Sequence, residues 1–490
     1  MGNFKLFLLE CRQLRHDGVF WATACAWLLV LVFGLANGQS WRDNQSPQIT
    51  ATVQQNRDSE TAQKQQAAAL RQQNAAKAEG KAAREGDPRY ALGYMAGTIP
   101  TLCLHPSGIS ALAVGQSDLN NPCAIVSPWE KLIRVRDHIE DTGGGNLEHP
   151  LRLLYGHFDI AFVMITLVPI VILILTYNLL SGEHELGTYF ILRCQSISLT
   201  RIIVARMLAR ALTLLLLTFV PIVWLLWQWG TPLDDPQTLW ELALWFIVTT
   251  AYIIFWFACS FWVNAYGKSS AENGLILAGI WLLLVVIVPG CLNLGLKQLY
   301  PMPSRMAFID ANREATVEVS KKKTELLGKY LIDHPDKVKL DKTHTVDDFI
   351  QTHLAIDEET RRVLEPHRTE FDVQKNRQHR LVEDLRFLSP AIVYQQISLL
   401  LTGQGQERQQ RFHAAVETYR ASLREFYLPR LLHDSPDFND YESVPRFSFQ
   451  ETKVNQQVPQ ALGAFAGLMI PTLVFAIFGW HSLRRLVTAN

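Results

Sequence analysis

The sequence lacks the motifs by which a chain performs chemistry on its own. Gly267-Lys268-Ser269 resembles the end of a nucleotide-binding loop, but Trp262 stands where that pattern requires its first glycine. Neither Ser107 nor Ser117 lies in Gly-x-Ser-x-Gly, and the histidines of the second half have no metal-ligand spacing. We therefore expect a chain that is not an enzyme, with no catalytic residue, no metal site and no cofactor of its own.

An excess of either charge is also missing, because 46 basic residues balance 46 acidic ones. We expect no nucleic-acid partner. What the sequence does have is long apolar runs. A hydrocarbon core about 30 Å thick needs roughly 20 apolar residues of helix. Six runs meet this length, and we predict membrane spans at residues 18–37, 159–181, 206–229, 238–264, 272–296 and 460–480.

Basic residues near the ends of these runs predict the orientation. They gather before the first run, between the second and third, and after the last, and these ends are cytoplasmic by the positive-inside rule. The turn 230–237 has Asp234 and Asp235 but no basic residue, so it belongs on the other side. Both termini, including the tail 481–490, are then cytoplasmic, and residues 38–158 and 297–459 are exported.

The first span has an alternative interpretation as a signal peptide, because Gly34-Leu35-Ala36 has the small residues of a cleavage site. The preceding residues 1–17 favour a span. This stretch is long for the part of a signal peptide that precedes the apolar run. It also contains Glu10 and repeats apolar residues at helical spacing. We expect an amphipathic helix on the cytoplasmic leaflet.

The exported stretches are predicted to be mainly helical. Residues 46–85 are rich in Ala, Gln, Lys and Glu, which indicates a long exposed helix or else a polar linker. The second stretch predicts a helical hairpin or bundle, with a seam of apolar residues at Phe412, Val416, Tyr419, Leu423 and Phe426. Residues 388–401 are too short to span, and we expect them on the outer membrane surface or against the first stretch.

Cysteine is scarce outside the membrane. Of seven cysteines, only Cys103 and Cys123 lie in exported segments. An oxidising compartment favours a disulfide between them, with two unpaired thiols as the alternative.

Polar residues within the predicted spans are few. They are candidates for a substrate path because burying polar groups in lipid is costly. Hydrogen bonds between helices, or solvation at the span ends, explain them equally well. The candidates are Tyr177, Asn178, Thr213, Thr218 and Asn264.

A family resemblance lies around the second span. It extends from His149-Pro150-Leu151-Arg152 through Tyr177-Asn178-Leu179-Leu180-Ser181 to Glu183, Glu185, Gly187 and Thr188. This run resembles ABC-2 type permeases, in particular the subgroup with large insertions after the first and before the sixth span. Leu388-Ser389-Pro390-Ala391 is also similar to that subgroup.

The resemblance implies an all-α membrane protein with six transmembrane helices and two mainly helical insertions that form a periplasmic domain. It implies the permease subunit of an exporter in the bacterial inner membrane. Two permease chains, identical or sister chains, would pair in the lipid bilayer. Separate ATPase subunits would bind ATP and Mg and dock from the cytoplasm.

Contacts with the ATPase are implied for two segments. The coupling segment 182–205 would act through Glu183, Glu185, Gly187 and Thr188, and the elbow helix 1–17 through Arg12 and Arg15. Two other functions stay open. One is a mechanotransmitter that drives a periplasmic partner without transport, and the other is a receptor or scaffold.

Overall fold

The computed structural model describes most of the chain. The described residues are 2–73, 86–115, 122–127, 134–135, 157–188, 198–266, 268–301, 310, 313–314, 317, 321, 345–432, 438–452 and 454–489. Within them the chain is largely helical, and six helical segments are long and apolar enough to cross a membrane. The prediction of a multi-pass helical membrane protein is confirmed at this level.

The six apolar segments coincide with the predicted spans. The first lies in α2 (Gly18–Gln72), the third is α11 (Leu199–Gln228), the fourth is α12 (Pro236–Asn264) and the sixth lies in α20 (Val454–Ala489). The second consists of α7 (Ile160–Phe162), a π-helical turn at Val163–Leu167, α8 (Val168–Thr176) and, after a turn, α9 (Ser181–Glu185). The fifth joins α13 (Ser270–Trp281) to α14 (Val288–Leu299) through a π-helical turn at Leu282–Ile287.

Helix α12 lies at the centre of the bundle, where α20, α11, α8 and α18 pack against it. Its large side chains Trp245, Tyr252 and Phe255 are almost completely buried. The fifth segment, by contrast, buries almost none of its apolar side chains within the chain. Lipid or a second membrane protein is the surrounding that such a surface requires.

The short helix α18 (Pro390–Leu401) lies deeper than we expected. It does contact the first polar stretch, since Thr402 donates to the Ala113 carbonyl oxygen at 3.4 Å. It also enters the bundle core, where the Trp245 indole donates to Ser398 Oγ at 2.9 Å and Tyr394 pairs with Thr249 at 3.0 Å. Of the two expected positions, the contact with the first stretch is present, and the helix is in addition buried in the bundle core, where these polar contacts offset the cost of burying its hydroxyl groups.

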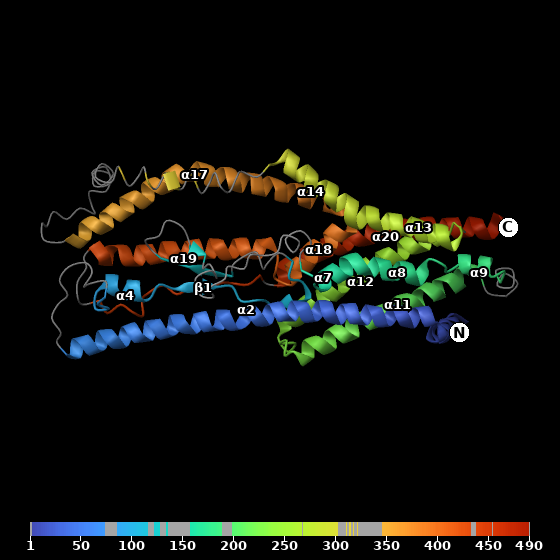
Figure 1. Cartoon of the computed structure of the whole chain (residues 1–490), viewed down its shortest axis with the longest axis horizontal. Coiled ribbons are helices and arrows are strands. Elements are labelled where there is room, and N and C mark those ends of the chain that lie inside the picture. Colours follow the sequence, from blue (N-terminus) through green and yellow to red (C-terminus); the bar gives the residue numbers. More distant parts are fainter. Residues whose placement is uncertain are drawn as a thin grey trace.

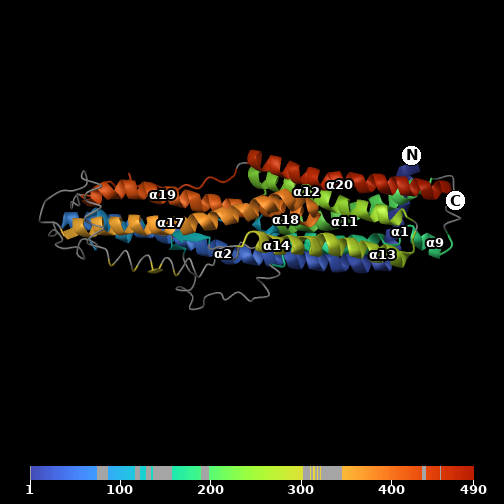
Figure 2. The ribbon, with the colours of Figure 1, turned by 90° about the horizontal axis from the view of Figure 1, so that it is seen from above.

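The molecule is elongated, with the bundle at one end and long helices projecting from it (Figure 1). Both termini and α9 lie at the end that we call the bundle end. Helix α2 continues past the bundle without a break, and α17 (Thr345–Leu385) and α19 (Gln406–Leu432) also extend to the opposite end, the projecting end. A view from above also shows the bundle at one end and the long helices extending from it (Figure 2). The helix predicted from residue 46 is present up to Gln72, and residues 74–85 lie outside the described part.

The projecting end has its own apolar core. Phe412, Val416 and Leu423 of α19 are buried there, with Tyr419 and Phe426 packed beside them, as the apolar seam predicted. Helix α4 (Ala91–Gly97) and a small sheet complete this core. His413 of α19 is half-buried, and its burial, aided by the Lys375 charge, lowers its pKa, although Glu417 opposes this shift.

A three-stranded antiparallel sheet is the part of the fold that the all-α prediction missed. It consists of β1 (Thr101–Cys103), β2 (Cys123–Ile125) and β3 (Arg134–Val135), in that order. Cys103 lies directly opposite Cys123 in the register, and the structure joins them in a disulfide. The pair closes a loop of 20 residues in sequence separation.

Asp159 connects the start of the second span to the loop at Val114 and Gly115. Its Oδ1 accepts from the Phe162 backbone N–H at 2.8 Å and so caps the second span. Its Oδ2 accepts from the backbone N–H groups of Val114 and Gly115, at 2.8 and 3.1 Å. One buried carboxylate thus holds two segments 44 and 45 residues apart in sequence.

Candidate functional site

An ion-pair cluster at the bundle end brings together the two segments implied to contact an ATPase. Arg206 of α11 donates from Nη2 to Glu183 Oε1 at 2.7 Å and from Nε to Glu10 Oε1 at 3.1 Å. Its Nη1 donates to the Leu179 carbonyl oxygen at 3.0 Å. We call Arg206, Glu10 and Glu183 the Arg206 junction. It connects α1 (Gly2–His16), α9 and α11.

The junction is largely enclosed, because its three side chains keep only 14%, 12% and 20% of their surface exposed. Charge-assisted hydrogen bonds with little access to water hold their partners at fixed distances. Removing one partner would leave an uncompensated charge, which is costly in such surroundings. The geometry is therefore suited to transmitting a displacement of α9 or α1 to α11.

Local sequence explains how α9 presents Glu183. Gly187 ends the turn after α9 with φ of +72°, a conformation that glycine adopts without strain. The chain then reverses, and the Thr188 hydroxyl donates back to Glu183. Glu185 Oε1 accepts from the Ser270 backbone N–H at 2.8 Å, at the start of α13. The predicted coupling residues thus contact the second, third and fifth spans.

Three other residues of the predicted coupling surface remain open to solvent. Arg12 and Arg15 are exposed on α1, and Glu185 is also exposed. Glu183 is instead turned inward, which suits holding the segment in place more than touching a partner. The rest of the segment, residues 189–197, lies outside the described part of the chain.

The predicted substrate-path residues are brought together only in part, since the Asn273 amide contacts the Tyr177 carbonyl oxygen at 3.4 Å and Asn264 Oδ1 at 3.5 Å. Thr218 is buried and accepts from the Trp27 indole at 3.1 Å, between α11 and α2. Asn264 is buried and donates to the Thr176 carbonyl oxygen at 3.0 Å, between α12 and α8. Thr213 donates to a carbonyl oxygen of its own helix at 2.7 Å. These contacts are those of packed helices.

The other two path residues lie near the bundle end. Asn178 is exposed and lines a pocket of about 220 Å³ beside the Arg206 junction, and Tyr177 is half-buried. Neither lies near the much larger cavity described next.

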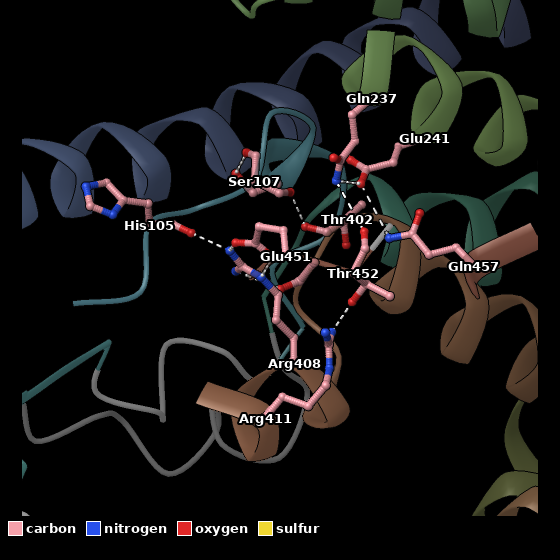
Figure 3. Close-up of polar contacts among 12 residues, drawn as sticks. His105, Ser107, Gln237, Glu241, Thr402, Arg408, Arg411, Glu451, Thr452 and Gln457 are labelled. Carbon is pink, nitrogen blue, oxygen red and sulfur yellow. Dashed lines mark hydrogen bonds and ion pairs between the residues drawn. The ribbon is translucent and has the colours of Figure 1, made fainter. Parts of the chain in front are cut away.

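A cavity of about 1210 Å³ lies where the bundle meets the projecting helices. Its walls come from the first turns of α12 and α20, from α18, from the facing ends of α17 and α19, and from the loop at His105–Gly108. Figure 3 shows the polar contacts around it. Sequence reasoning missed this site, because its walls come from segments as far apart as 303 residues.

One wall of the cavity carries two arginine side chains, each of which binds acceptors of neighbouring residues. Arg408 donates from Nε to Glu451 Oε2 at 2.8 Å and from Nη2 to the His105 carbonyl oxygen at 2.7 Å (Figure 3). Arg411 donates to the Thr452 hydroxyl. Opposite them, Glu241 of α12 accepts from two glutamine side chains.

A second group on the cavity has the residue types of a metal site. The ligand atoms of His379, Glu383 and Glu407 lie within 4.8 Å of one another. Both carboxylates are exposed, and acidic groups on solvated surfaces commonly lie this close without an ion. We assign no metal to them.

Comparisons with known proteins reach only part of the chain. Residues 305–450 match the domain of unknown function DUF3526. The match covers less than a third of the sequence and includes α17, α18 and α19. No curated protein and no solved structure matches the chain.

Proposed function

We propose that the chain is the permease subunit of an ATP-binding cassette exporter. In this proposal it lies in the bacterial inner membrane beside a second permease chain, with both termini cytoplasmic and the projecting end in the periplasm. ATPase subunits dock at the bundle end and supply the energy for outward movement of a substrate. The Arg206 junction is the observation that carries the proposal.

The junction supports coupling because it connects the cytoplasmic segments that a docked partner would push. Glu10 lies on α1 and Glu183 on α9, and both bind the same guanidinium group of α11. A force applied to α9 then reaches α11 through bonds of fixed length rather than through a flexible loop. Both chain ends and α9 lie at the same end of the molecule (Figure 1).

The proposal is tested by isolating the full chain with its partners from native membranes and comparing two arginine variants. Arg206→Met keeps much of the side-chain length but removes the charge. We expect the ATPase to co-purify and its activity in the reconstituted complex to fall about tenfold, as the loss of a charged hydrogen bond worth about 1.5–3 kcal/mol predicts.

Arg377→Met is the matched control, since Arg377 is exposed on α17, away from the segments assigned to the ATPase contact. It should retain the activity of the wild type. Absence of any ATPase from the purified complex would contradict the proposal. So would equal activity of the two variants.

A mechanotransmitter is the second candidate, favoured by the length of the helices that project from the bundle. Helix α2 alone has 55 residues and α17 has 41. The two functions differ in one measurement. A transporter moves a solute into the lumen of inside-out vesicles when ATP is added, whereas a transmitter hydrolyses ATP with no such uptake. A receptor or scaffold would lack the ATPase.

A further inference from the structure

The floor of the large cavity contains a carboxylate that forms no ion pair within the described part of the chain. Glu241 is only 5% exposed, and its Oε1 accepts from Gln237 Nε2 at 3.1 Å and from Gln457 Nε2 at 3.4 Å. Both donors are neutral amides. A buried charge with neutral partners alone is costly, and such groups near a membrane commonly mark a ligand path.

Four basic residues line the cavity, Lys375, Arg386, Arg408 and Arg411, and two of them are engaged by other acceptors. Arg408 uses three nitrogens on Glu451, His105 and Gly403, and Arg411 binds Thr452 (Figure 3). Among the described residues none of these four forms an ion pair with Glu241, and the Arg408 charge acts on it only across a distance. Glu241 therefore lacks a directly bonded positive partner within the described part of the chain.

A second unsatisfied acceptor lies beside Glu241. Gln457 is 6% exposed, and its Oε1 has no hydrogen-bond partner among the described residues. Its amide nitrogen is committed to Glu241, so this oxygen cannot be satisfied by rotating the amide without losing that bond. Glu241 and Gln457 thus place two acceptors side by side, a carboxylate without a cation bonded to it and an enclosed amide oxygen without a described donor.

The rest of the lining limits the kind of molecule that can supply this donor. Apolar side chains from three helices, Val382, Phe387, Ile397 and Leu399 among them, line the same cavity. Its volume of about 1210 Å³ exceeds the range of about 300–1,000 Å³ that is usual for small-molecule sites. A suitable ligand is large, has an apolar part to lie against these side chains, and carries a protonated nitrogen.

We propose that this cavity binds an amphipathic amine, whose ammonium group donates hydrogen bonds to Glu241 and to Gln457 Oε1. The remainder of the ligand lies against the apolar wall. This inference depends on the proposed function only in treating the bound amine as the exported substrate. Binding itself requires neither ATP nor a partner chain.

The test measures binding to the purified full chain in lipid nanodiscs, without ATPase. The probes are dansylcadaverine, a fluorescent primary amine, and its N-acetylated derivative, which is neutral and nearly the same size. We expect the amine to bind at least about tenfold more tightly than the neutral derivative, because one charged hydrogen bond contributes about 1.5–3 kcal/mol. Glu241→Gln should abolish this difference and leave the affinity for the neutral derivative unchanged.

Glu383→Gln is the matched control, because Glu383 lines the same cavity but is exposed. It should retain the preference for the amine. Gln457→Met, which removes the second acceptor without a change of charge, should weaken amine binding severalfold, and it keeps the proposal testable if Glu241→Gln does not fold. Equal affinities of the wild type for the two probes would overturn the proposal, as would an unchanged preference in Glu241→Gln. Either result would leave co-purification of an ATPase unaffected, so the permease proposal is tested separately.

Discussion

Replacing Asp159 by asparagine should loosen the attachment of the loop at Val114 and Gly115 to the second span. The substitution keeps one accepting oxygen, which can still cap α7 through the Phe162 N–H. It replaces Oδ2 by an NH₂ group, so the buried N–H groups of Val114 and Gly115 lose their acceptor. Each buried donor left without a partner costs about 1–3 kcal/mol. We expect the free energy of unfolding to decrease by about 2–6 kcal/mol.

The assay is titration of the purified full chain with SDS in mixed micelles, followed by circular dichroism. Asp235→Asn is the matched control. Asp235 is exposed and caps only its own helix, by accepting from Thr238 N at 3.0 Å. Asparagine caps helices about as well as aspartate, so this variant should lose less than about 1 kcal/mol. Equal losses in the two variants would refute the reasoning that Asp159 joins separate parts.

Three further predictions concern other parts of the chain. His413 has a pKa below its unfolded value of about 6.5, so the unfolded chain takes up this proton first as the pH falls. The free energy of unfolding should then decrease below about pH 6.5, and His413→Gln should remove part of that decrease in a pH series of melting curves. Replacing Cys103 and Cys123 by serine should cost about 3 kcal/mol and abolish the effect of reductant on thermal unfolding. Thr218→Val should cost about 0.6–2 kcal/mol, since it removes the partner of the Trp27 indole, and a loss of transport without a loss of stability would contradict this packing role.

The six spans were predictable because each apolar run is by itself long enough to indicate a membrane-spanning helix. The position of α18 was not, since its 12 residues suit a buried helix and a surface helix equally. Only contacts with residues such as Trp245, which is 153 positions away from Ser398, decide between them. The small sheet escaped prediction because strands of two and three residues are too short to show an alternating pattern.

The Arg206 junction could be predicted only in part. Glu183 stands in a motif that resembles a known family, but its partners carry no local signal. In the sequence, Arg206 is only one of several basic residues that indicate the membrane orientation of the chain. Glu10 lies 196 positions before it. Pairing across such a separation depends on how α1 packs against α11, which the periodicity of either helix alone does not fix.

Because α2 is one continuous helix, a small tilt at one of its ends produces a large displacement at the other. At about 1.5 Å per residue its 55 residues span about 80 Å. A tilt of about 5° at the embedded end would then displace its far tip by about 7 Å, by the geometry of a rigid rod of that length. Small rearrangements among the spans are thereby amplified at a distance, and the tip is the place where a fluorescent reporter would register them most strongly.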